Sequence, residues 1–251
     1  MANASCHMSL STAPPYNCRP ADNRKNKVKT AEELLRSSQW AQGLSEAQMA
    51  RAVAGTIERQ IPAGGFVCMK GEPVDHWMGV IDGLVKMASH WSTGKTTSLA
   101  GIPAGGWFGE GSLLKDEPRR YDVVALRDSR IAYLHRNTFH WLQDHSIPFN
   151  RFLVTHINER LGQFIGMMEN ERLLDTDARI ARCLAGLFNP ILGPGARRQV
   201  EISQEELGYL AGISRQRVNQ ALRLLEERGL LRIEYGRINV LDVAGLAGFG
   251  D

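Results

Sequence analysis

The chain contains, at residues 201–240, the segment EISQEELGYLAGISRQRVNQALRLLEERGLLRIEYGRINV. Ser203 can cap a helix there, and Glu206 three residues later completes a capping box. Gly212 is expected to end that helix, and Ser214 can cap a second one. Apolar residues at three- and four-residue spacing give the second helix a buried stripe, namely Val218, Ala221, Leu222 and Leu225. The segment therefore predicts two short helices joined by a tight turn.

The other face of the second helix is basic and amide-rich, with no carboxylate between Ser214 and Leu225. It carries Arg215, Gln216, Arg217, Asn219, Gln220 and Arg223. In the DNA major groove, Arg can bind guanine and Asn or Gln can bind adenine, each through paired hydrogen bonds. This composition is typical of the recognition helix of a helix-turn-helix. Alternating residues at Leu231–Glu234 and Arg237–Val240 then predict a two-stranded wing.

A charged helix face is, by itself, also typical of a solvated surface. Three further features favour DNA binding when they are taken with the basic face. These are the glycine turn, the wing, and the small residues Gly208 and Ala211 at the place where the two helices would cross closely. The net charge is only +3, so nucleic acid would be bound through placed basic residues rather than through bulk charge.

The 251 residues leave room for about two domains. No apolar run approaches the ~20 residues that cross a bilayer, and the first residues lack the features of a signal peptide. We therefore expect a cytoplasmic protein without a membrane partner. The cysteines at positions 6, 18, 68 and 183 form no C-x-x-C pair, so no metal site is predicted.

The chain divides into segments of different character. Residues 1–30 are polar and basic, and we expect a flexible tail. Residues 31–145 begin with short helical patterns and continue as short apolar runs between closely spaced glycines, which predicts an all-β barrel or sandwich. Within it, Gly94-Lys95-Thr96 lacks the glycine that a P-loop requires at position 89, so a hairpin tip is expected there.

Residues 146–174 have the period of one long helix, and we expect dimerisation through its apolar positions. These are Phe149, Leu153, Ile157, Leu161, Phe164 and Met168. A helix that packs only on its own barrel is the alternative. Asp175 can cap the next helix and is the expected hinge to a DNA-binding domain at residues 175–251.

This order of parts resembles the Crp/Fnr family of transcription regulators over residues 40–241. The most specific segments are Phe108-Gly-Glu-Gly-Ser-Leu-Leu, Arg119-Arg120, Leu174-Asp175 with Ile180-Ala-Arg, and residues 203–225. The resemblance implies an α+β fold with an N-terminal double-stranded, jelly-roll-like β-roll, a long dimerisation helix and a C-terminal winged helix-turn-helix. It also implies an allosteric homodimer that binds a palindromic operator in double-stranded DNA, with RNA polymerase as a further partner.

The resemblance also implies an effector site in the roll. Glu110 would bind a ribose hydroxyl and Arg120 a cyclic phosphate, assisted by backbone N–H groups near Gly109. The neighbouring candidates are Arg119, Tyr121, Phe164 and Ile165. Tyr121 and Asp122 depart from the pattern of nucleotide-binding members, and Phe164 and Ile165 stand where hydroxyl groups would face the base. Two alternatives stay open: a cyclic nucleotide, or a structural Glu110–Arg120 ion pair in an empty or differently filled pocket.

On the DNA side, the resemblance implies base contacts from Arg215, Gln216 and Gln220. Phosphate contacts are expected from Ser203, Arg217 and Arg237, and Ser214 and Asn219 complete the candidate DNA-binding set. An iron-sulfur cluster is not expected, because the N-terminal cysteines are not clustered. No H-x-H pair and no G-x-S-x-G elbow occurs, so we do not expect an enzyme. The competing function is a nucleotide-binding signalling module whose winged helix binds protein.

Overall fold

The computed structural model describes residues 30–90, 96–194, 198–234 and 236–250. The predicted tail and the predicted hairpin tip at Gly94-Lys95 lie outside these residues. The described chain begins with α1 (Ala31–Ser37), the short 3-10 helix η1 (Gln39–Ala41) and α2 (Glu46–Ala54). Capping boxes at Thr30 and Ser45 start the two α-helices, as the helical patterns of this region predict.

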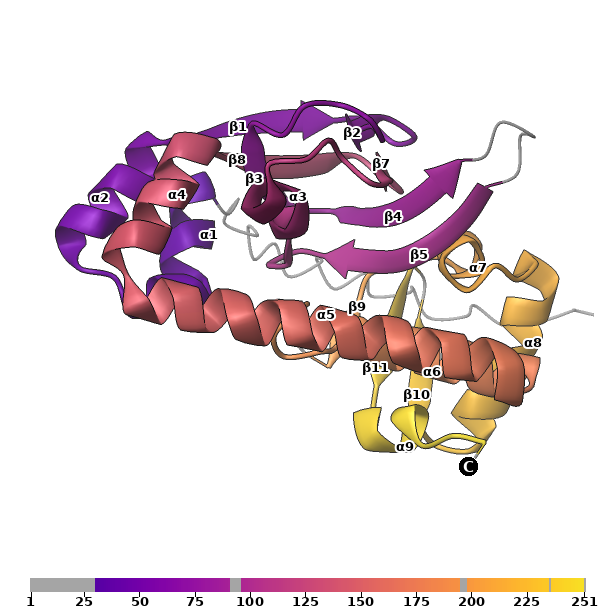
Figure 1. Ribbon diagram of the computed structural model, residues 1–251. Coiled ribbons are helices and arrows are strands. Elements are labelled where there is room, and N and C mark those ends of the chain that lie inside the picture. The colour runs from indigo at the N-terminus through magenta and orange to yellow at the C-terminus, as the bar shows by residue number, and fades with distance from the viewer. Residues whose placement is uncertain (1–29, 91–95, 195–197, 235, 251) are drawn as a thin grey trace, which may run out of the picture.

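Two four-stranded antiparallel sheets follow and face each other as a β-roll (Figure 1). The first contains, in spatial order, β1 (Thr56–Ile61), β8 (Ser129–His135), β3 (His76–Asp82) and β6 (Trp107–Phe108). The second contains β2 (Phe66–Cys68), β7 (Asp122–Ala125), β4 (Leu84–His90) and β5 (Thr96–Pro103). Fully buried Val80, Val85, Ile102, Val123 and Ile131 fill the space between the sheets. The predicted β architecture of this region is confirmed.

Two helices of the roll were not predicted as separate elements from residue patterns. The short α3 (Glu110–Lys115) follows β6, and α4 (Arg136–His145) follows β8. Together with α1 and η1, α4 covers the first sheet over an aromatic cluster. Its members are Trp40, Trp77, Trp107, Phe139 and Phe149, with the ring centroids of Trp77 and Trp107 4.4 Å apart. This cluster holds the first turns of the next helix on the roll.

That helix, α5, runs over the 27 residues Ile147–Leu173 and confirms the predicted long helix. Ser146 begins it, because its hydroxyl accepts a hydrogen bond from the backbone N–H of Phe149 at 3.3 Å. Extended backbone at Leu174 ends it, and Asp175 caps α6 (Thr176–Gly186) as predicted. Figure 1 shows α5 running from the α1, α2 and α4 end of the roll to the C-terminal domain.

The C-terminal domain contains α6, α7 (Gln204–Ala211), α8 (Arg215–Glu227), α9 (Val243–Ala247) and a small sheet. The sheet consists of β10 (Leu231–Glu234), β11 (Arg237–Val240) and β9 (Gln199–Val200). The predicted cap at Ser203 and turn at Gly212 are confirmed, since Gly212 has φ +67°. Ser214 caps α8, and β10 and β11 are the predicted wing.

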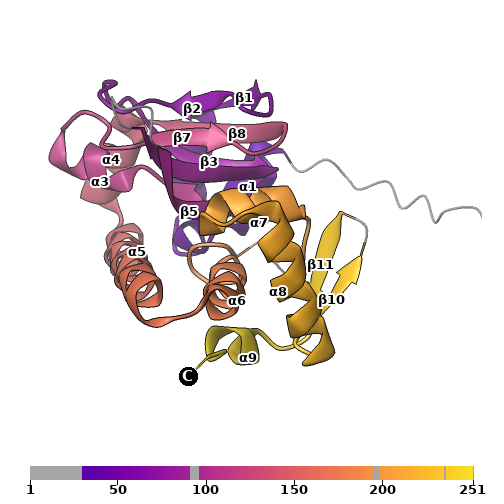
Figure 2. The same cartoon turned by 90° about the vertical axis from the view of Figure 1, so that its right-hand side faces the viewer.

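The roll and the C-terminal domain are in contact in this arrangement. Leu84 of β4 belongs to the same buried cluster as Leu207 and Leu210 of α7. Figure 2 shows α7 lying directly beside β5. Within the described ranges, no helix is both long and apolar enough to span a membrane.

Candidate functional site

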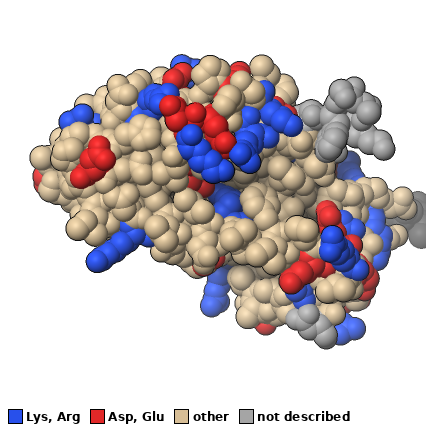
Figure 3. Space-filling view, in the orientation of Figure 1, with Lys and Arg blue, Asp and Glu red and all other residues tan. Residues whose placement is uncertain are grey.

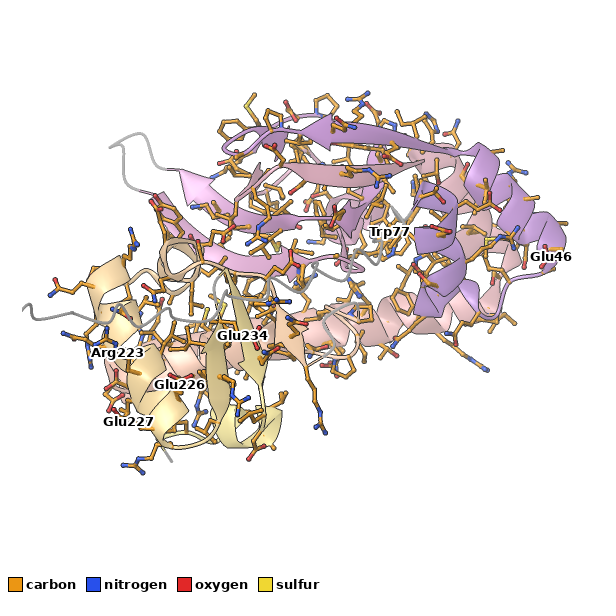
Figure 4. All side chains as sticks on the ribbon, turned by 180° about the vertical axis from the view of Figure 1, so that it is seen from behind. Glu46, Trp77, Arg223, Glu226, Glu227 and Glu234 are labelled. Carbon is orange, nitrogen blue, oxygen red and sulfur yellow. The ribbon has the colours of Figure 1, made fainter. Side chains whose placement is uncertain are left out.

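The exposed face of α8 is the first candidate site. Its apolar stripe is fully buried against α6 and α7, so the opposite face points to solvent. Arg215, Gln216, Gln220 and Arg223 are exposed on that face. Figure 4 shows Arg223 on the outer side of α8, with Glu226 and Glu227 near its C-terminal end. The surface is thus basic and polar along the first turns of the helix and acidic only at its end.

Some of the predicted DNA-binding side chains have partners within their own domain. Arg217 pairs with Asp177 of α6 (Nη2 to Oδ2, 2.9 Å) and donates to Oε1 of Gln220 at 3.3 Å. Asn219 accepts a hydrogen bond from the Gln204 amide at 3.2 Å. Arg237 pairs with Glu234 on the wing at 2.9 Å. The sequence patterns did not indicate Asp177 as a partner, because the contact joins residues 40 positions apart.

The second candidate site lies where α3 meets α5. Gly109 precedes α3 with φ +90°, and the side chain of Glu110 is buried. Trp77 donates its indole N–H to Oε2 of Glu110 at 3.4 Å, and Nε2 of His156 lies 3.6 Å from Oε1. The carboxylate of Glu110 therefore faces α5 and the first sheet.

The two adjacent arginines have opposite environments. Arg119 is buried and donates to the backbone oxygens of Gly109 (3.3 Å) and His76 (2.6 Å). A side chain at Gly109 would collide with this guanidinium, so glycine is needed there for the contact. The approach of Arg119 to Gly109 is thus a feature of the folded roll that the Arg119-Arg120 pair alone does not reveal.

Arg120, in contrast, has a 65% exposed side chain and forms two hydrogen bonds to Glu117, at 2.6 and 2.8 Å. The alternative of a structural Glu110–Arg120 ion pair is therefore wrong. The two arginines project to opposite sides of the segment before β7, and only Arg119 points inward. Figure 3 shows acidic and basic side chains side by side over α3, where Lys115 and Asp116 also lie.

Tyr121 and Phe164 are two further candidates for the effector site, and the charge of Arg119 acts on Tyr121. Both pack against the cluster between the two sheets, and burial, aided by the charge of Glu110, raises the pKa of Tyr121. Asp122 is buried and accepts a hydrogen bond from the backbone N–H of Lys70 at 2.8 Å. Ile165, by contrast, is half exposed on α5 and is not part of this cluster.

Sequence reasoning missed two buried polar residues of α5 at this site. His156 is fully buried, and Arg160 is buried and donates to the backbone oxygen of Trp107 at 3.2 Å. Both continue the three- and four-residue spacing of Phe149 and Leu153, which are buried as well. That spacing could have indicated that His156 and Arg160 are buried, but polar side chains are not counted in an apolar pattern.

The same stripe corrects part of the predicted dimer surface. Phe149 and Leu153 are buried against the aromatic cluster of their own chain, so the prediction that these two residues contact a partner helix is wrong. Phe164 is partly buried on its own roll, and its predicted partner contact stays a prediction. The exposed apolar residues of α5 lie one position away. Between the exposed ends Ile147 and Leu173 they are Val154, Ile157, Leu161, Ile165 and Met168, which include three of the predicted residues and repeat at intervals of three and four.

Two family models match the chain. The cyclic nucleotide-binding domain matches residues 58–146, and the Crp-like helix-turn-helix domain matches residues 178–249. The chain belongs to the Crp/Fnr family of transcription regulators. The predicted fold class and the predicted function of a Crp/Fnr-type DNA-binding regulator are thereby confirmed.

Relatives of this Crp/Fnr protein align over most of its length. A CRP-like cAMP-activated global transcriptional regulator of Mycobacterium tuberculosis is 26% identical over 220 residues, covering 86% of this chain and 98% of that one. A cyclic AMP receptor protein of Thermus thermophilus is 27% identical over 219 residues, covering 84% and 95%. These relatives are transcription regulators rather than enzymes.

The fold is also found among solved structures. FixK2 from Bradyrhizobium japonicum superimposes with a TM-score of 0.64 at 18% identity, covering 78% of this chain and 98% of that one. In the present Crp/Fnr chain, the first matched domain ends at Ser146, the cap of α5, and the second begins within α6. Helix α5 therefore lies between the two matched domains and contacts both the roll and α6.

Proposed function

We propose that this protein is a homodimeric regulator that reads a palindromic DNA operator with the exposed face of α8 and adjusts its DNA affinity to an effector held by the roll. The observation that carries the proposal is the exposed, acid-free first half of α8, which begins with Arg215 and Gln216. Arg215, Gln216 and Gln220 would read base edges. Ser203, Ser214, Arg217, Asn219 and Arg237 would contact the DNA backbone or position the reading residues. The protein would act in the cytoplasm together with RNA polymerase.

The base-reading role is tested on DNA enriched from a random duplex library by the wild-type protein. Arg215→Ala and Gln216→Ala are each expected to weaken binding about tenfold to a hundredfold and to relax the preference for one base pair. Arg36→Ala is the control, because Arg36 is an exposed arginine of α1 that pairs with Glu32. Unchanged affinity and preference in both α8 variants would remove α8 as the reading helix.

The effector proposal rests on Arg119, the buried cation beside Gly109. The relatives named above are described as cAMP-activated or as a cyclic AMP receptor, and an arginine can donate two hydrogen bonds to a phosphate. To bind a cyclic phosphate, the Arg119 guanidinium would exchange the carbonyl oxygens of Gly109 and His76 for the ligand. Tyr121 would then shift with it, since it lies close enough to Arg119 for the two charges to interact.

Calorimetric titration with cyclic AMP and cyclic GMP tests this proposal. We expect binding to the wild-type protein and to Arg120→Ala, and loss of binding in Arg119→Ala. The neighbouring Arg120 is a matched control, since its side chain faces solvent and pairs with Glu117. Heat from neither nucleotide would exclude this ligand class, and equal binding by both variants would exclude Arg119 as its anchor.

A further inference from the structure

Arg127 lies between β7 and β8, and its side chain extends from the roll to the helix-turn-helix. Its Nε and Nη2 donate to the two carboxylate oxygens of Glu206 at 2.8 and 2.6 Å, and Nη1 lies 3.9 Å from Oε2 of Glu201. The Glu206 side chain is only 12% exposed, so solvent screens this pair little. Paired hydrogen bonds between arginine and carboxylate are among the strongest that proteins form.

Glu206 has a second role in the same place. It is the capping-box residue of α7, and its Oε2 also accepts a hydrogen bond from the backbone N–H of Ser203 at 2.7 Å. One carboxylate therefore joins the roll to the N-terminus of the first helix of the helix-turn-helix. The Arg127–Glu206 ion pair therefore holds the N-terminal end of α7 against the roll.

Close apolar packing continues the contact along α7. A Cβ atom on Gly101 of β5 would lie 2.8 Å from Cδ1 of Leu210 and 2.9 Å from Cδ2 of Leu187, so a side chain here would displace these leucine methyl groups. Leu84 is buried in the core of the C-terminal domain. Nζ of Lys86 lies 5.1 Å from the ring centroid of Tyr209, and burial lowers the pKa of this lysine. The roll thus holds α7 by charge, by packing and by a cation–π contact.

The position of this contact matters for DNA binding. In a helix-turn-helix the first helix crosses the DNA backbone, and N–H groups at helix N-termini commonly bind phosphates. Here the N-terminal turn of α7 lies against Leu126 and Arg127, which share a surface hollow with Ser203 and Glu206. The reading face of α8 and Ser203 remain exposed, whereas the Glu206 carboxylate in the N-terminal turn of α7 is held by Arg127 of the roll.

We propose that the Arg127–Glu206 pair is a latch that holds α7 on the roll in a closed arrangement, and that tight DNA binding requires its release. The proposal rests on the DNA-binding function proposed above. It adds a defined contact through which the roll restrains the helix-turn-helix. The latch consists of Arg127 and Glu206, with Gly101 and Leu210 as the apolar contact behind them.

The chain contains its own reporter for opening of the latch. Cys183 of α6 lines a cavity of about 1090 Å³ between β5, α5, α6 and α7, and burial raises the pKa of its thiol to about 12. Cys68 is buried inside the roll, away from this cavity. Cys183 is only partly buried, so separation of the two domains would increase its exposure to a thiol reagent and leave the buried Cys68 protected.

The test measures labelling of these two cysteines by mass spectrometry in the full-length protein. In Arg127→Ala and in Glu206→Gln, Cys183 is expected to react about fivefold faster than in the wild type, which matches the loss of a partly buried ion pair. Cys68 is expected to react at its wild-type rate. Gln is chosen because it preserves the capping box. The control is Arg130→Ala, which breaks a pair with Glu58 at 2.7 Å inside the roll. If Cys183 reacted at the wild-type rate in both latch variants, the latch proposal would be overturned.

The second measurement uses a duplex enriched from a random library by wild-type protein. Arg127→Ala is expected to bind it about fivefold more tightly, in proportion to the faster Cys183 labelling. Faster labelling with unchanged DNA affinity would overturn the restraint on DNA. Absence of any enriched duplex, for wild type and variant alike, would overturn both the proposed function and that restraint, whereas unchanged labelling overturns the latch alone.

Discussion

His156 of α5 is a buried titratable group that faces Glu110 of the roll. Its ring is stacked on Phe152, with centroids 5.3 Å apart, and lies beside Glu110 and Arg160. Burial lowers the pKa of His156, with Glu110 opposing this shift and Arg160 adding to it. The imidazole is therefore held neutral between two charged side chains, and protonation would place a cation in a buried site.

The depressed pKa gives the folding stability a defined pH dependence. The unfolded histidine titrates near pH ~6.5, above the folded value, so the unfolded chain binds the proton first as the pH falls. Stability is retained above about pH 6.5 and falls below it, by at most about 1.4 kcal/mol per pH unit. We predict that His156→Gln reduces the drop in Tm between about pH 7.5 and about pH 5.5. The exposed His145 gives the control His145→Gln, and equal effects of the two variants would contradict the prediction.

Single residues differ in how far the sequence alone predicts them. Ser203, Glu206 and Gly212 act within their own turn, so local spacing predicted their roles correctly. The burial of Arg119 and the exposure of Arg120 depend on how Gly109 packs against the guanidinium, which adjacent identical residues cannot reveal. His156 was missed because its burial is set by α3 and β6, which lie far from it in the sequence.

At the scale of elements, α5 illustrates what periodicity can and cannot establish. Its spacing predicted a helix of nearly the observed length, but two apolar stripes run along it. The stripe through Phe149 and Leu153 packs on the roll, and the stripe through Val154 and Leu161 is exposed. Helix α4 was missed altogether, because its cap is the imidazole of His135, an uncommon N-cap residue.

The exposed stripe of α5 supports a dimer prediction that a single substitution tests. Leu161 is 56% exposed and lies seven residues from both Val154 and Met168, the spacing of a coiled-coil position. Leu161→Glu would place a carboxylate in an apolar seam and is expected to weaken dimerisation at least about tenfold, as measured by sedimentation equilibrium. Thr155→Glu, on an exposed polar position of the same helix, should leave the dimer intact. A fully dimeric Leu161→Glu protein would place the interface elsewhere.

At the scale of the whole molecule, the two domains share one buried cluster. Leu84 of the roll lies in the core of the C-terminal domain, and Leu187 and Leu210 pack closely against Gly101. Sequence patterns predicted each domain, because each has its own local signals. They did not predict this contact, since it joins residues more than 80 positions apart. The closed arrangement is therefore a property of the assembled chain rather than of either domain.

This shared cluster leads to a prediction for domain separation. Gly101→Val adds a branched side chain where a Cβ atom alone would lie 2.8 Å from Cδ1 of Leu210, so we expect it to displace Leu210, and α7 with it, from β5. We expect Cys183 to label severalfold faster, as in the latch variants, and the radius of gyration measured by solution scattering to increase. Gly111→Val is the control, because a Cβ atom on Gly111 meets open space. If Gly101→Val kept the wild-type labelling rate and radius, the roll and the helix-turn-helix would have to be held together by contacts other than the β5–α7 packing.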